Sequence, residues 1–321
     1  MTEPIIGATY CPHSGQLRDI YSSLQLIHAN AVQIVISNSR GTSFLPTNDD
    51  INSRLENMDI YMVAHGMYTI NLCNRGSQFS FNKRELIKQI QICEQLNCDI
   101  IIHQGKNTQT LPLHNAMKLY VDAITEIIRD SNTSMTQILL ENSSHAGTEM
   151  GYNISQLAQI YNMFPSDIKN RIGFCLDTCH AFVAGELDLR NLDSIKHFIF
   201  DFDRSIGISN LRVIHLNDSK SPFGSHSDRH SSWMFGHITN QHLPNTNTNG
   251  LLYFMLIMFA NNIPMVMETD TDKYGWDVAF TKNVIYSHQL KKATENIKKM
   301  FALQSDNTKT FALTLTTHHS K

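Results

Sequence analysis

The sequence lacks an apolar run long enough to cross a membrane. Its longest candidate, residues 251–260, has the length of a buried helix, whereas a membrane-spanning helix needs about 20 apolar residues. The first ten residues also lack the basic stretch and the apolar core of a secretory signal. These absences predict an intracellular protein that is neither secreted nor membrane-bound, and they leave cytoplasm and nucleus open.

Cysteine is scarce and scattered, with six residues in a chain of 321. This usage does not resemble the dense disulfide framework of small secreted domains, and it favours a reducing compartment. Cys175 and Cys179 have a spacing that could suit zinc. However, Cys175 falls inside an apolar run, and the sequence has no second cysteine pair of the same spacing that would complete a four-cysteine site. We therefore expect both thiols to pack in the interior.

Positive charge is not in excess either. The formal net charge is −3, and that balance argues weakly against a protein that grips nucleic acid phosphates. Histidine, in contrast, is abundant, with 16 residues, and neutral imidazole is the commonest metal ligand in proteins. Three bound divalent ions would make the total charge positive and concentrate that charge at one site.

Short apolar runs alternate with longer amphipathic segments along most of the chain. Segments 83–96 and 113–129 carry apolar residues at the helical period. The strand candidates are residues 5–8, 31–36, 61–64, 99–103, 137–141, 172–177, 211–216 and 264–268. Eight strands that alternate with helices predict an α/β fold, a single (β/α)8 TIM barrel with parallel strands. We expect this domain to span residues 1–303, followed by a loosely held tail, residues 304–321.

The stretch 172–185 shows the change from strand to polar chemistry most clearly. Its apolar run ends abruptly at Asp177, and His180 follows three residues later. The pair offers an oxygen and a nitrogen donor to a cation, but a helix-capping Asp and a hydrogen-bonded His would give the same pattern. This pair alone leaves both interpretations open.

Function in such barrels lies at the C-terminal ends of the strands. Metal-ligand types occur at six successive strand ends and in two neighbouring loops: His65, His103, Glu141, Asp177, His180, His215, Asp228, His230 and Glu268. Because stability alone does not require such a series, we predict that these residues form a metal cluster. Five histidines and four carboxylates are too many for one zinc ion and suit two or three ions. The share of nitrogen donors favours zinc over magnesium.

The stretches that carry these residues resemble the endonuclease IV family of apurinic/apyrimidinic endonucleases. The resemblance rests on AHGMYTINL (64–72), IHQG around His103, LLEN around Glu141, CLDTCHAFVAG (175–185), HLNDSK (215–220), DRH (228–230) and MET around Glu268. These stretches follow one another in order, and the match covers nearly the whole barrel, from about residue 7 to residue 268.

The resemblance implies three zinc ions per chain in a DNA repair enzyme of base excision repair. It divides the nine residues into three sets: His65, His103 and Glu141; Glu141, Asp177, His215 and Glu268; His180, Asp228 and His230. It implies hydrolysis of the phosphodiester bond 5′ to an abasic site in duplex DNA, which leaves a 3′-hydroxyl and a 5′-deoxyribose phosphate, and trimming of blocked 3′ ends. Glu141 is the expected catalytic residue, because a bridging carboxylate fixes the spacing of two ions and orients the nucleophile.

The partner implied by the resemblance is double-stranded DNA with abasic sites or blocked 3′ ends. We expect the protein to be a monomer, although the sequence does not fix its oligomeric state. Arg40 and Tyr68 stand at the positions that probe the minor groove around the lesion. Lys220 and Arg229 are expected to contact phosphates.

Some positions depart from the family pattern. Gln104 follows His103 where the family has proline, Thr69 stands where a larger apolar residue is usual, and Thr9 replaces a histidine. The loops after Glu141 and after the DRH stretch also differ. These departures bear on lesion preference and on DNA affinity.

Two other functions remain open from the sequence. A sugar isomerase or epimerase on the same barrel would use one or two ions and would not need Asp228 and His230 for a third. A noncatalytic barrel that binds damaged DNA would share the fold, although no expected ligand is missing. Metal stoichiometry separates the first alternative from the endonuclease, and incision of an abasic duplex separates the second.

Overall fold

The predicted barrel is confirmed. The structure, a computed structural model, describes residues 3–37, 44–240 and 248–286. The strands pair in parallel in the closed order β1-β10-β7-β6-β5-β4-β3-β2. Their bounds are β1 (Ile6–Tyr10), β2 (Ala31–Val35), β3 (Tyr61–His65), β4 (Asp99–His103), β5 (Ile138–Glu141), β6 (Ile172–Asp177), β7 (Leu211–His215) and β10 (Met265–Met267).

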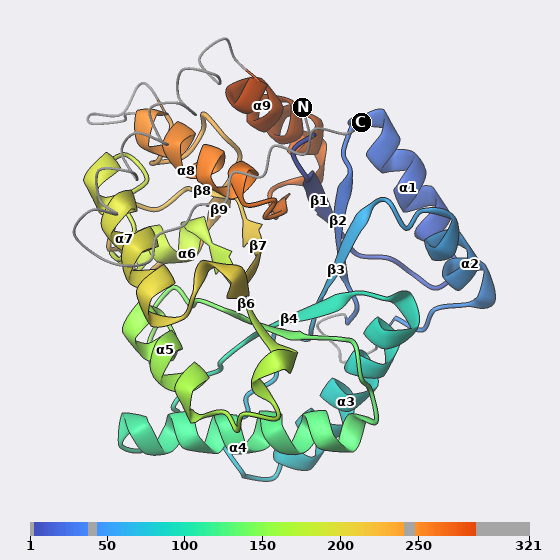
Figure 1. Cartoon of the computed structure of the whole chain (residues 1–321), viewed down its shortest axis with the longest axis vertical. Coiled ribbons are helices and arrows are strands. Elements are labelled where there is room, and N and C mark those ends of the chain that lie inside the picture. Colours follow the sequence, from blue (N-terminus) through green and yellow to red (C-terminus); the bar gives the residue numbers. More distant parts are fainter. Residues whose placement is uncertain (1–2, 38–43, 241–247, 287–321) are drawn as a thin grey trace.

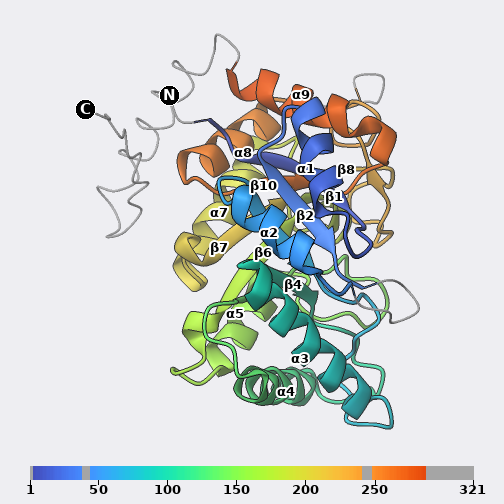
Figure 2. The ribbon, with the colours of Figure 1, turned by 90° about the vertical axis from the view of Figure 1, so that its right-hand side faces the viewer.

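Helices surround the barrel, as Figure 1 shows. They are α1 (Leu17–Leu26), α2 (Asn48–Glu56), α3 (Phe79–Leu96), α4 (Leu113–Ser131), α5 (Ile154–Met163), α6 (Thr178–Val183), α7 (Leu192–Ser205), α8 (Thr248–Ala260) and α9 (Tyr274–Tyr286). Helices α3 and α4 lie side by side outside the strands (Figure 2). In the described residues, none of these helices is both long and apolar enough to traverse a lipid bilayer.

The helices form where the sequence places an apolar stripe or a capping residue. In α4, Met117, Tyr120 and Ile124 recur at helical spacing and are fully buried against the barrel. Helix α2 begins with a capping box, in which the Thr47 hydroxyl accepts from the Asp50 amide and the Asp50 carboxylate accepts from the Thr47 amide. The predicted helical segments 83–96, 113–129 and 251–260 lie within α3, α4 and α8.

Several predicted boundaries were wrong by one or two residues, and a small two-stranded sheet was missed. Strand β1 runs to Tyr10, and β3 includes His65. Two short strands, β8 (Asp218–Ser219) and β9 (His230–Ser231), form an antiparallel pair outside the barrel. Such two-residue strands carry no readable alternation. The predicted tail and the last part of the predicted domain, residues 287–321, lie outside the described residues.

The barrel interior is a small apolar layer with polar residues directly above it. The layer consists of Ala31, Val63, Ile101, Leu139, Cys175, Val213 and Val266. Alternate residues of a strand face the same side, so the inward side chain two positions further on each strand lies one layer nearer the C-terminal end. Those next positions are polar on every one of these strands: Gln33, His65, His103, Glu141, Asp177, His215 and Glu268.

Candidate metal centre

The structure brings the nine predicted metal ligands together at the C-terminal end of the barrel. Their donor atoms form three groups, each with all atoms within 4.8 Å of one another. The first group is His65, His103 and Glu141; the central group is Glu141, Asp177, His215 and Glu268; the loop group is His180, Asp228 and His230. This division matches the one implied by the family resemblance. That the groups bind zinc stays a prediction.

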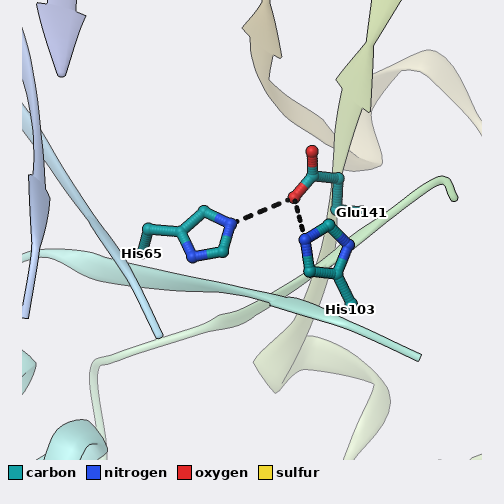
Figure 3. A group of neighbouring side chains, drawn as sticks. All are labelled: His65, His103 and Glu141. Carbon is teal, nitrogen blue, oxygen red and sulfur yellow. Dashed lines mark hydrogen bonds and ion pairs between the residues drawn. The ribbon is translucent and has the colours of Figure 1, made fainter. Parts of the chain in front are cut away.

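The first group meets at one oxygen of Glu141. The Oε2 atom lies 3.3 Å from His65 Nε2 and 3.6 Å from His103 Nε2, and Figure 3 shows both imidazoles turned toward that oxygen. His65 and Glu141 are almost fully buried, whereas the side chain of His103 is 25% exposed. The group is therefore open to solvent only through His103.

The central group uses the other oxygen of Glu141. The Oε1 atom lies 2.9 Å from His215 Nδ1, which is also 3.1 Å from Glu268 Oε2 and 3.8 Å from Asp177 Oδ2. Glu141 thus faces two groups with two different oxygens. This is the arrangement that a bridging carboxylate requires.

The loop group is the most exposed of the three. His180 Nε2 lies 3.0 Å from Asp228 Oδ2, and His230 Nε2 lies 3.2 Å from Asp228 Oδ1. The side chain of Asp228 is 42% exposed and that of His230 is 19% exposed. This group therefore sits where a substrate can reach it.

The histidines are oriented as metal ligands would be. An imidazole ligand presents a lone pair when its other nitrogen donates to an oxygen that can only accept. His65 Nδ1 donates to the Gly66 carbonyl at 2.8 Å, and His180 Nδ1 donates to the Asn142 carbonyl at 2.9 Å. Another backbone carbonyl, that of Glu268, lies 3.2 Å from His230 Nδ1. In each case the Nε2 atom faces the carboxylates, so this donor set fits a borderline-soft cation such as zinc.

The pKa values of the donor groups reflect both their burial and the charges of their neighbours. Burial lowers the pKa of His103 to about 4, so this imidazole is neutral at pH 7. Burial would also lower the pKa of His230, but Asp177 and Asp228 outweigh it and raise the pKa to about 9. Burial would raise the pKa of Glu268, yet His215 brings the pKa down to about 2. Nearby carboxylates favour the protonated form of a histidine such as His230. A bound cation would displace that proton.

Two buried asparagines hold the strand ends around Asp177. Asn142 accepts from the Asp177 amide at 2.7 Å and donates to the Asp177 carbonyl at 3.1 Å. Asn217 donates to Asp177 Oδ2 at 2.7 Å and accepts from the Glu268 amide at 2.8 Å. Asp177 Oδ1 also caps α6 by accepting from the His180 amide at 2.7 Å. The spacing of Asp177 and His180 therefore serves both the cap and the approach of His180 to the cluster.

The loop that follows His230 is wound around one carboxylate. Asp218 is fully buried and accepts from the amides of Ser219 at 2.6 Å, Ile238 at 2.9 Å, Thr239 at 3.2 Å and Gly236 at 3.3 Å. A Cβ atom on Gly236 would collide with Asp218 Oδ1, so only glycine fits there. Because β8 pairs with β9, Asp218 also fixes the strand that carries His230.

A cavity of about 500 Å³ opens onto the centre. Tyr68 and Thr69 line it together with His103, His180 and Asp228. The Tyr68 ring stacks on His65 with 4.2 Å between centroids, and it is 54% exposed. The structure thus places Tyr68 at the entrance to the first group.

The other predicted DNA contacts lie at the surface or outside the described residues. Lys220 Nζ is 3.8 Å from Asp270 Oδ2, and the Lys220 side chain is 52% exposed. Arg229 is exposed between the two loop-group residues Asp228 and His230. Arg40 lies outside the described residues.

The two cysteines near the centre are buried, as expected. Burial raises the pKa of both Cys175 and Cys179 to about 12, so both remain thiols at neutral pH. Cys175 belongs to the inner apolar layer. The sulfur atoms of both cysteines lie within 4.8 Å of candidate ligand atoms, Cys175 beside Glu141 and His215, and Cys179 beside Asp177 and His230.

The departures from the family pattern occupy defined places. Gln104 is fully buried and its side-chain amide has no hydrogen-bond partner among the described residues. The loop after Glu141 is compact, because the Glu149 carboxylate accepts from the Ser144 hydroxyl at 3.1 Å and the Ala146 amide at 3.0 Å. In the same loop His145 stacks on Tyr152. Ser144 and Glu149 of this loop line the cavity together with Thr69.

Sequence reasoning missed the supporting residues. Gln33, Asn142, Asn217 and Asp218 are fully buried or nearly so and are bonded to predicted ligands or to the elements that carry them. Gln33 had a readable signal, since it follows Ala31 by two residues on its strand just as His65 follows Val63. The contacts of Asp218 depend on how a loop folds back, and no spacing reveals them.

Fold and site together define a barrel with a metal-type donor cluster at its C-terminal face. The family model described as "Xylose isomerase-like TIM barrel" matches residues 25–245. The described structure is similar to the crystal structure of endonuclease IV from Thermus thermophilus, with a TM-score of 0.73, 19% identity and coverage of 88% of this chain and 99% of that one. It is also similar to a D-tagatose 3-epimerase-like protein, with a TM-score of 0.60, 18% identity and coverage of 92% and 99%. At these identities the likenesses show the fold alone.

Sequence similarity identifies the family within this fold. A protein of Halothermothrix orenii named "Probable endonuclease 4" is 33% identical over 250 residues, which are 76% of this chain and 85% of that protein. The chain therefore belongs to the endonuclease IV family, and it is a hydrolase of the endonuclease IV type.

Proposed function

We propose that this protein incises duplex DNA on the 5′ side of abasic sites, using three zinc ions, and that it also trims blocked 3′ ends. The products of incision would be a 3′-hydroxyl and a 5′-deoxyribose phosphate. The observation that carries the proposal is the meeting of two donor groups at the two oxygens of Glu141, with a third group beside them at 3.0 and 3.2 Å spacing around Asp228. A donor set for three adjacent cations suits phosphodiester hydrolysis, in which charge develops on both the attacking and the leaving oxygen.

Zinc ions held by the three groups would supply Lewis acid stabilisation of that charge and a water acidic enough to be a nucleophile near neutral pH. The residues of this chain do the positioning. Glu141 is fully buried, so its two oxygens cannot turn toward solvent and the separation between the first and central groups is fixed. His180, Asp228 and His230 lie at the more open side, where the leaving oxygen of a bound strand would be placed.

Recognition of the damaged sugar falls to the rim of the cavity. An abasic nucleotide has no base to stack, so it leaves the duplex at lower cost than an intact nucleotide. Tyr68 is half exposed beside the first group and would occupy the space next to the extruded sugar. Lys220 and Arg229 would contact the flanking phosphates. Arg40, which lies outside the described residues, would probe the minor groove beside the lesion together with Tyr68.

The test is incision of a labelled duplex that contains one tetrahydrofuran abasic analogue. Zinc-replete wild type should make a single cut on the 5′ side and leave a 3′ end that a DNA polymerase extends. An undamaged duplex of the same sequence is the control for general nuclease activity. A wild type that holds zinc but leaves the abasic duplex intact would move the function to the sugar isomerase or epimerase class.

A further inference from the structure

Two of the eight inward positions at the top of the barrel are not predicted metal ligands. They are Thr9 on β1 and Gln33 on β2, which are paired in register. Gln33 is fully buried and Thr9 is 9% exposed. Each lies directly next to strands that carry ligands, since β2 neighbours β3 and β1 neighbours β10.

The side chain of Gln33 reaches two ligands of the central group at once. Its Oε1 atom lies 2.7 Å from His215 Nε2, and its Nε2 atom lies 2.6 Å from Glu268 Oε1. The same amide nitrogen lies 3.2 Å from Thr9 Oγ1. The amide orientation is fixed by these contacts, because only the NH2 group can donate to a carboxylate.

This contact decides which nitrogen of His215 is free. An imidazole that donates from Nε2 to Gln33 presents its Nδ1 lone pair, and Nδ1 is the atom that faces Glu141 Oε1 and Glu268 Oε2. In His65, His180 and His230, the nitrogen that faces away from the carboxylates donates instead to a backbone carbonyl. His215 alone among these four depends on a side chain.

Gln33 also controls Glu268. Its NH2 group binds Oε1 of that carboxylate and leaves Oε2 directed at His215 Nδ1. Thr9 holds the same NH2 group from the neighbouring strand, and the Thr9 carbonyl accepts from the Tyr274 hydroxyl at 2.6 Å. The threonine is therefore anchored on both its side chain and its backbone.

We propose that Gln33, held by Thr9, is a positioning residue of the central zinc site, which selects the metal-binding nitrogen of His215 and the metal-binding oxygen of Glu268. The inference deepens the proposed function and rests on the zinc centre proposed there. It also gives a role to Thr9, at a position where the family has histidine. Supporting residues of this kind typically change metal affinity by about 10–100-fold.

The test compares Gln33→Met with wild type in zinc retention, measured as ions per chain after equilibration with graded chelator. Methionine has a similar length and volume but cannot form these hydrogen bonds. We expect Gln33→Met to lose one ion at a chelator concentration about 10–100-fold lower than wild type. The matched control is Gln104→Met, which also replaces a fully buried glutamine but removes no side-chain hydrogen bond seen in the described residues; it should retain zinc like wild type.

A second readout reports the nitrogen itself. Long-range 1H–15N spectra of zinc-loaded wild type should show the His215 proton on Nε2 and protected from exchange, and Gln33→Met should lose that protection. Equal zinc retention in Gln33→Met and wild type, or a His215 proton on Nδ1, would overturn the proposal. Should Gln33→Met not fold, Thr9→Val tests the same pair, with an expected shift of a few-fold in the same direction; unchanged retention would count against it.

Incision is assayed on the same samples to separate the two proposals. A wild type that binds zinc and shows the Gln33 effect but does not cut abasic DNA contradicts the proposed activity and leaves the positioning role standing. If the wild type cuts abasic DNA but Gln33→Met retains zinc like wild type, the positioning role is contradicted and the proposed activity stands.

Discussion

The central group and the loop group offer similar donor atoms on different supports. The central ligands Asp177, His215 and Glu268 stand at the ends of barrel strands and are at most 10% exposed. Asp228 and His230 stand in a loop, with exposures of 42% and 19%. The comparison shows that the barrel itself fixes the first kind of ligand, whereas the second kind depends on whatever holds the loop, here the buried carboxylate of Asp218.

The largest effect is expected at the residue that both strand-borne groups share. Glu141→Gln removes the charge that faces two groups and should lower the rate of abasic-site incision by about a thousandfold or more, since several kcal/mol of transition-state stabilisation are at stake. The surface variant Glu126→Gln, whose carboxylate pairs with Lys83 and Arg75 and with none of the predicted metal ligands, should cut like wild type. Equal rates for Glu141→Gln and wild type would show that the two groups do not act together.

Asp218→Asn should weaken the loop that carries Asp228 and His230 without affecting the ligands at the strand ends. An amide in place of the carboxylate points an NH2 group at backbone donors, so the loop should loosen at a cost of about 1–3 kcal/mol. We expect zinc measured per chain to fall from about three to about two, with only the loop group emptied. A variant that loses all its zinc, or none, would break the proposed distinction between strand-borne and loop-borne ligands.

Acidity should act unequally on the two candidate ligands His230 and His103. The pKa of His230 is raised to about 9 in the protein alone, so below pH 9 a cation must displace a proton there, and affinity should fall as the pH is lowered. The pKa of His103 is lowered to about 4, so this ligand needs no proton removed above pH 4. Calorimetry of zinc binding in buffers of different ionisation enthalpy should detect proton release at pH 7. His230→Gln should release fewer protons, and His103→Gln should release as many as wild type.

The smallest effect is expected from Glu94, which stabilises the barrel scaffold and does not contact either group. Glu94 at the end of α3 accepts from the amides of Ser134, Met135 and Thr136. Burial would raise its pKa, but these amides lower the pKa to about 2. The carboxylate therefore stabilises the fold above about pH 4.5, and this stabilisation is lost as the pH falls toward 2. Glu94→Gln should lower the melting temperature at pH 7 by a few degrees, with zinc content unchanged and the difference from wild type vanishing in acid.

The difference in support also explains what the sequence could predict. The strand-borne ligands were readable because period-two alternation in a parallel barrel puts His65, Glu141 and Asp177 at equivalent places. Their division into groups came from the family resemblance, since spacing along the chain does not say which donors meet. Asp218 and Asn217 were not readable as supports, because their partners are backbone groups brought close only by the folded loops.

The most direct test of the account is a crystal structure of the zinc-loaded protein with anomalous data collected above and below the zinc edge. We predict three anomalous peaks: one between His65, His103 and Glu141, one within the central group, and one between His180, Asp228 and His230. A single peak, or two peaks with the loop group empty in the wild type, would contradict the three-ion centre and favour a sugar isomerase or epimerase.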